Sequence, residues 1–138
     1  MADVWVEYEQ RDRFLVRIGR HRVVVDQPVG DGGGDAGPSP VELFAASLAA
    51  CTGFYAERYI RRHDLPVEGL EIECDFSMSD DEPARVATVD LRVVTPAELT
   101  PARRAGLRRV VEHCTVQNSL RQPPAVNLRV VARETVAA

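Results

Sequence analysis

Residues 26–66, DQPVGDGGGDAGPSPVELFAASLAACTGFYAERYIRRHDLP, predict a glycine-rich loop followed by one long helix that carries a cysteine. Ser39 suits the N-cap, Pro40 suits the first helical position, and Glu42 completes a capping box. Small residues crowd this helix and would let another backbone approach closely, so we place it at the centre of the fold. Its apolar stripe runs to about residue 63 with three- and four-residue steps and comprises Val41, Phe44, Leu48, Cys51, Tyr55 and Tyr59.

The loop before this helix, residues 26–40, is rich in Gly, Pro and Asp. It resembles a phosphate-binding loop, but it lacks the GK[ST] sequence and does not run directly from a strand into a helix. We therefore expect it to fold over a site or over a partner subunit.

The rest of the chain predicts short strands and a second helix in one domain, residues 1–138, without repeats. Residues 3–10 alternate apolar and polar side chains with the period of two of a half-buried strand. Thr100-Pro101 opens the second helix, whose buried side is predicted to carry Leu107, Val110, Val111 and Cys114. The predicted strands cover residues 3–10, 13–18, 21–27, 67–79, 84–95 and about 125–135.

Composition excludes several classes of function. The net charge of −4 argues against nucleic acid or an anionic membrane as the main partner, and no apolar run is long enough to span a membrane. All 17 basic residues are arginine, so a Walker-A lysine and Schiff-base chemistry are both excluded. The first residues do not resemble a secretory signal, and an odd number of cysteines (three) fits a reducing cytoplasm, where we expect the protein.

Cys51 and Cys114 could form a redox pair only if the fold joins them, because they lie far apart in the sequence. A thiol that reacts with an oxidant needs a second thiol nearby, since its sulfenic acid otherwise oxidises irreversibly. The alternative is that both are buried as small hydrophobic residues, which is common for free cysteine. Cys74 is interpreted as a packing residue. The cysteines and histidines have no metal-ligand spacing, so no metal site is expected.

The charged residues also have structural interpretations. Four arginines on the second helix, Arg103, Arg104, Arg108 and Arg109, are most simply a solvated face. His63 is expected to interact with the C-terminal dipole of the long helix.

The quoted stretch resembles the signature of the OsmC/Ohr family, the osmotically inducible and organic hydroperoxide resistance proteins. The shared pattern is a strand ending in D-x-P, a glycine-rich loop, and P-x-E-L leading to A-x-C; HCTVQNSL resembles the family's second cysteine segment. The resemblance implies a two-layer α+β fold. It would have a strongly curved, mainly antiparallel sheet around two central helices and would form an intertwined homodimer.

The resemblance also implies an activity, that of a thiol-dependent peroxidase for organic hydroperoxides. Cys51 would be the peroxidatic cysteine and Cys114 the resolving one, with a dithiol such as protein-bound lipoyl as reductant and no cofactor. The alternative is a non-peroxidase member that binds a small apolar ligand or senses redox state at the dimer interface.

An arginine and a glutamate support the reactive thiolate in the hydroperoxide-resistance branch. Arg11 is the best match for the arginine, with Arg13 and Arg17 as alternatives. The glutamate departs from the pattern, because Val41 follows the helix-opening proline and Glu42 comes one residue later. One step turns a helical side chain by about 100°, so Glu42 is either the partner of the arginine or only the helix cap.

Large apolar side chains near Cys51 predict a substrate pocket. The pocket residues that we predict are Phe44, Leu48, Phe54 and Tyr55, all within about two helical turns of the thiol. Such walls would favour bulky organic hydroperoxides over hydrogen peroxide, which has no apolar surface to bury.

Overall fold

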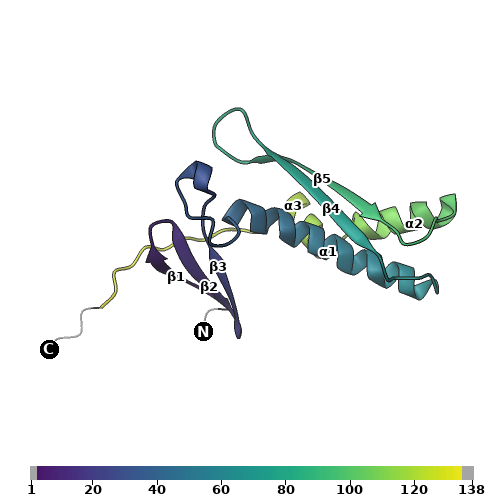
Figure 1. Ribbon diagram of the computed structural model, residues 1–138, viewed down its shortest axis with the longest axis horizontal. Coiled ribbons are helices and arrows are strands. Elements are labelled where there is room, and N and C mark those ends of the chain that lie inside the picture. Colours follow the sequence, from purple (N-terminus) through teal and green to yellow (C-terminus); the bar gives the residue numbers. More distant parts are fainter. Residues whose placement is uncertain (1–2, 135–138) are drawn as a thin grey trace.

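The computed structural model describes residues 3–134, and within them the chain forms two antiparallel sheets and three α-helices (Figure 1). The α+β composition and the antiparallel pairing agree with the fold class predicted from the sequence. The elements are β1 Val4–Gln10, β2 Arg13–Ile18, β3 His21–Val25, a 3-10 turn Val29–Asp31, α1 Pro40–Arg62, β4 Glu71–Met78, β5 Val86–Val94, α2 Pro101–Val111 and α3 Thr115–Arg121.

The N-terminal sheet has the strand order β1-β2-β3 and exposes one apolar face. Its register places Val4 opposite Ile18 and Tyr8 opposite Phe14, and all four are more than one third exposed. Because directly opposed residues share a face of a sheet, these side chains form one patch. In the single chain these apolar side chains remain exposed to solvent.

The glycine-rich loop folds around the carboxylate of Asp26, which is buried. This carboxylate accepts hydrogen bonds from the backbone N–H groups of Gln27 (2.8 Å), Ala36 (3.1 Å) and Gly34 (3.2 Å). The Ala36 N–H has the largest effect on the pKa of Asp26 and lowers it, and burial opposes this effect. The amides that could bind a phosphate are therefore occupied by the protein's own carboxylate.

The start and the end of α1 are as predicted. Ser39 and Glu42 form the capping box: the Ser39 hydroxyl accepts from the Glu42 N–H (3.1 Å), and the Glu42 carboxylate accepts from the Ser39 N–H (3.0 Å). His63 is the C-cap, and its ring Nδ1 lies 2.8 Å from the carbonyl oxygen of Tyr59 in the last turn. This contact agrees with the expected interaction of His63 with the helix end.

The predicted inner face of α1 is wrong by about one residue. The buried residues are Ala45, Leu48, Thr52, Ala56 and Ile60, so of the predicted stripe only Leu48 is fully buried. The reason is that α1 packs closely on the β4–β5 hairpin, where alanine allows contact with the strands. The larger side chains lie beside that contact, and Phe44 remains 39% exposed.

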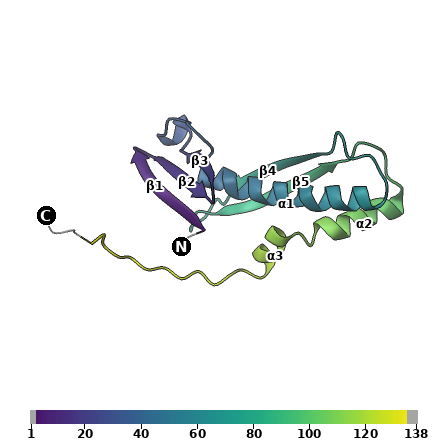
Figure 2. The same ribbon diagram turned by 90° about the horizontal axis from the view of Figure 1, so that it is seen from below.

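Helix α1 also packs against α2 and α3, and in the view of Figure 2 both of these helices lie below it. The two long helices approach each other closely at Gly106, where a β-carbon would lie 2.3 Å from the Tyr59 hydroxyl. This contact fixes α2 beside α1. Within residues 3–134, no helix is long and apolar enough to cross a membrane.

Three predictions about the C-terminal half and the sheet need correction. The second helix ends at Val111, and Cys114 is instead the N-cap of α3. Residues 125–134 form no strand, and residue 135 lies outside the described residues. The described strands form two separate sheets instead of one curved sheet. The last two differences have one physical cause, because a strand needs a neighbour and a single chain offers none to this segment.

Candidate functional site

Cys114 is fully buried at the N-terminus of α3. Its Sγ accepts a hydrogen bond from the backbone N–H of Gln117 at 3.4 Å. Burial raises the pKa of Cys114, the N–H of Gln117 lowers it, the neighbouring Cys51 thiol raises it, and the Thr52 hydroxyl lowers it. A free backbone N–H at this helix start therefore points at the Cys114 sulfur.

Cys51 lies near Cys114, because its thiol is among the groups that raise the Cys114 pKa. It is half-buried on α1, about three turns from the helix start, and both thiols are free. The hydroxyl of Tyr55, one turn further, lies 2.9 Å from that of Thr115, the first residue of α3. The fold therefore joins two cysteines that are distant in the sequence, and a hydroxyl contact holds their helices together.

Thr52 follows Cys51 in the chain, lies near Cys114 and was not identified from the sequence. It is buried, its hydroxyl donates to the Leu48 carbonyl oxygen at 2.9 Å, and it lies near enough to Cys114 to lower the pKa of that thiol. Its position next to Cys51 was the only available signal. Gln117 was missed because its contribution is a backbone N–H.

The N-terminal arginines predicted to activate Cys51 lie on the β1–β2–β3 sheet. Arg11 is exposed in the β1–β2 turn with a positive φ of 47°. Arg13 lowers the pKa of Asp26, and Arg17 pairs with Glu7. Within residues 3–134, no cation is among the groups that shift the pKa of Cys114. The activating role of Arg11 remains a prediction.

Glu42 lies at the first turn of α1, where its carboxylate bonds to the Ser39 backbone. No ion pair in the described part of the chain includes it. The capping role is thus observed, and the role as partner of an arginine remains a prediction.

The four predicted substrate-binding residues differ in their surroundings. Leu48 is 4% exposed and belongs to the core, whereas Phe44 and Phe54 are exposed. Tyr55 is half-buried, with its hydroxyl bonded to Thr115. Their role in binding a substrate remains a prediction.

Cys74 lies on β4, apart from the pair, with its Sγ 3.9 Å from the Ala45 carbonyl oxygen. Burial, together with the charges of Asp75 and Asp90, raises its pKa. Thiolate is the reactive form of cysteine, so these surroundings make Cys74 a poor nucleophile.

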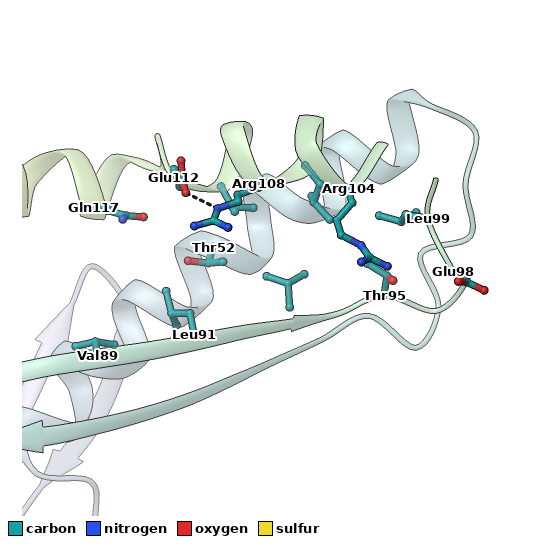
Figure 3. A pocket seen from close by; sticks show the side chains of 13 residues that line it. Thr52, Val89, Leu91, Thr95, Glu98, Leu99, Arg104, Arg108, Glu112 and Gln117 are labelled. Atoms are coloured by element: carbon teal, nitrogen blue, oxygen red, sulfur yellow. Dashed lines mark hydrogen bonds and ion pairs between the residues drawn. The ribbon is translucent and has the colours of Figure 1, made fainter. Parts of the chain in front are cut away.

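A cavity of about 720 Å³ lies between β5 and α2, close to the thiol pair (Figure 3). Thr52 and Gln117, which both contact Cys114, line one part of it. None of the four predicted substrate-binding residues lines this cavity. In the sequence, the alternation of Val89, Leu91 and Val93 predicts one apolar face of a strand. It does not predict which element packs over that face.

Comparisons with known proteins agree with this arrangement. A structure from Psychrobacter arcticus, described as an osmotic stress induced and detoxification response protein, has a TM-score of 0.79 at 24% identity, covering 86% of this chain and 88% of that one. An organic hydroperoxide resistance protein OsmC from Legionella pneumophila gives 0.66 at 18%, covering 88% and 90%. The organic hydroperoxide resistance protein OhrB of Bacillus subtilis gives 0.62 at 23%, covering 87% and 91%.

At these identities the solved structures establish the fold alone. No curated protein matches the chain in sequence. Residues 32–129, which include both Cys51 and Cys114, match the family described as OsmC-like protein. Since this match covers well over half of the chain, the protein belongs to the OsmC-like family.

Proposed function

We propose that the protein is a thiol-dependent peroxidase that reduces organic hydroperoxides through Cys51 and Cys114. The observation that carries this proposal is the unequal access of two adjacent thiols: Cys51 is half-buried, whereas Cys114 is fully buried beside it. A peroxide from solvent can reach Cys51, and the sulfenic acid that forms already has its second thiol beside it.

The reaction has three steps. The Cys51 thiolate attacks one oxygen of the hydroperoxide, the O–O bond breaks, and a Cys51 sulfenic acid forms while the alkoxide leaves and takes up a proton to become the alcohol. Cys114 then attacks the Cys51 sulfur, the disulfide forms, and water leaves. An external dithiol reduces this disulfide to two thiols and is itself oxidised to a disulfide.

The surroundings of Cys114 support its role in the second step. Burial raises its pKa and holds it as a thiol at rest, while the Gln117 N–H and the Thr52 hydroxyl stabilise the thiolate when it forms. A resolving cysteine of this kind does not compete for the oxidant. It reacts when the neighbouring sulfur has become electrophilic.

A homodimer is part of this proposal. The chain exposes 10945 Å², whereas a compact monomer of this length exposes about 7,100 Å². The C-terminal segment adds Val126, Leu128 and Val130, each more than four fifths exposed. A second copy that covers these residues and the apolar face of the N-terminal sheet would account for the excess, and could bring an N-terminal arginine such as Arg11 to Cys51.

The walls of the substrate site follow from the same assembly. Phe44 and Phe54 are 39% and 55% exposed on the face of α1 that lies away from the hairpin. With a partner subunit against this face, the two rings and Tyr55 would enclose an apolar entrance to Cys51. A bulky organic hydroperoxide fits such an entrance better than hydrogen peroxide does.

Val41 at the position of the family glutamate favours the alternative, in which the thiols sense redox state or the protein binds an apolar ligand without turnover. Turnover of tert-butyl hydroperoxide with a dithiol reductant separates the two functions. A peroxidase consumes many equivalents of peroxide per subunit, whereas a sensor stops after one.

The thiol variants test the assigned roles. Cys51→Ser should abolish peroxide consumption with the fold intact, because the substitution is nearly isosteric. Cys114→Ser should reduce one equivalent and then overoxidise at Cys51, as mass spectrometry of the Cys51 peptide would detect. Cys74→Ser is the matched control and should keep wild-type turnover. Full activity of Cys51→Ser would refute the proposed mechanism.

A further inference from the structure

The cavity between β5 and α2 has the properties of a ligand site that is separate from the reacting thiols. Its volume of about 720 Å³ lies in the range of small-molecule sites, roughly 300–1,000 Å³. Neither Cys51 nor Cys114 lines it. Its apolar lining comes from the inner face of β5 and from the facing side of α2 and the segment before it, and consists of Val89, Leu91, Val93, Leu99, Leu107 and Val111.

One cation at the mouth of this cavity has no anionic partner. Arg108 donates to the Glu112 carboxylate at 2.8 Å, so these two charges compensate each other. The Arg104 side chain makes no ion pair within residues 3–134. Figure 3 shows Arg104 extending across the cavity toward Thr95, while Glu98 points away from it.

We propose that this cavity binds a monocarboxylate with an unbranched apolar chain. The carboxylate pairs with Arg104, and the chain lies along β5 against Leu91 and Val93. Arginine is suited to a carboxylate because its guanidinium can donate two parallel hydrogen bonds. Val89 and Val93 are four residues apart, about 13 Å along a strand, which is close to the extended length of about ten carbons.

The far end of this ligand would lie next to Cys114. Thr52 and Gln117 line the cavity; the Gln117 N–H donates to the Cys114 sulfur, and Thr52 lies near enough to lower the pKa of that thiol. Cys51, which the peroxidase proposal makes the reacting thiol, does not line it. Binding of a carboxylate without a peroxide group therefore tests this site independently of turnover.

The experiment is a calorimetric titration of the reduced, full-length protein with decanoate and with octanoate. One decanoate per subunit is expected, with an affinity about fifteenfold above that of octanoate, from a factor of about four for each added methylene. Arg104→Gln should weaken decanoate binding by tenfold or more, because a charge-assisted hydrogen bond is lost. Arg104→Lys should recover part of this loss.

Two further variants make the test specific. Arg103→Gln is the matched control, because Arg103 is the neighbouring arginine of α2 but does not line this cavity; its affinity for decanoate should stay within twofold of wild type. Val93→Phe should fill the cavity and weaken decanoate at least tenfold. Circular dichroism at the titration temperature verifies that each variant is folded.

Three outcomes would overturn the proposal. The first is the absence of saturable decanoate binding, as expected if a segment of a partner subunit fills the cavity. The second is equal weakening by Arg103→Gln and Arg104→Gln, which would mean a general attraction of the anion to α2. The third is unchanged binding in Val93→Phe, which would place the ligand elsewhere.

Discussion

Replacing Gly33 with alanine should disrupt the loop that sets the start of α1. A β-carbon at this position would lie 2.1 Å from the carbonyl oxygen of Gln27 and 2.5 Å from the carbonyl carbon. Ordinary contact between such atoms is about 3.5 Å. Both atoms belong to the backbone, so the chain itself must move.

The size of the effect follows from what this movement breaks. Two backbone hydrogen bonds depend on the close approach, from Asp35 N–H to Gln27 (3.0 Å) and from Gly33 N–H to Pro28 (3.1 Å). Two such bonds contribute about 2 kcal/mol, and a forced backbone shift costs about 1–3 kcal/mol. A loss of about 3–5 kcal/mol corresponds to a melting temperature lower by roughly 10–17 °C for a chain of this size.

Gly30→Ala is the matched control in the same loop. A β-carbon at Gly30 meets nothing within 4 Å, so this variant should be neutral or up to about 1 kcal/mol more stable, because alanine restricts the unfolded chain. Differential scanning calorimetry at one protein concentration compares the two. If Gly33→Ala melted within about 2 °C of Gly30→Ala, the close approach of Gly33 to Gln27 would not exist.

Further predictions concern pH, assembly, substrate and the link between the helices. The pKa of Asp26 is lowered in the fold, so the ionised carboxylate stabilises the protein above the unfolded pKa of about 3.9, and this stabilisation is lost as the pH falls through the folded value. Asp26→Asn should therefore have a lower melting temperature at pH 7. Its melting temperature should also depend less on pH in the acid range. Deleting residues 123–138 should abolish the dimer, as light scattering on a sizing column would measure, and a stable dimer after deletion would contradict the role of this segment. An alkyl hydroperoxide that buries four methylenes should gain about 3 kcal/mol of binding free energy relative to hydrogen peroxide, which is roughly a hundredfold in kcat/KM. Equal kcat/KM values for the two peroxides would mean that no apolar entrance exists. Tyr55→Phe removes the 2.9 Å contact with Thr115 and should cost about 0.5–1.5 kcal/mol of stability, and chemical denaturation that showed no change would remove the proposed link between α1 and α3.

The ends of α1 were predictable because they depend on local chemistry. Ser39, Pro40 and Glu42 form a capping box from neighbouring residues, and the structure contains it. The inner face of the same helix was not predictable in this way. Alanine has little hydrophobicity, yet Ala45 and Ala56 are buried because the hairpin approaches closely, and this distance is a tertiary property.

The candidate site shows the same division. Cys51 and Cys114 were identified from the residues around them, and the fold brings them together. Thr52 and the backbone N–H of Gln117 carry no pattern in the sequence, because they matter only once α1 meets α3. The final strand illustrates another limit: residues 125–134 alternate in the manner of a strand, but a strand needs a second one beside it, and a single chain does not provide it.

The loop around Asp26 also connects the N-terminal sheet to the start of the long helix. The Asp26 N–H donates to the Pro38 carbonyl oxygen (3.2 Å), so the end of β3 is tied to the residue before the N-cap of α1. This bond and those to the Asp26 carboxylate fix the path of the chain where the N-terminal sheet leads into the long helix. Residues 123–134 donate no backbone hydrogen bond in the described chain, and in Figure 1 this segment extends past the N-terminal sheet. In the proposed dimer, the backbone groups of this segment would gain their hydrogen-bond partners only when the second subunit binds.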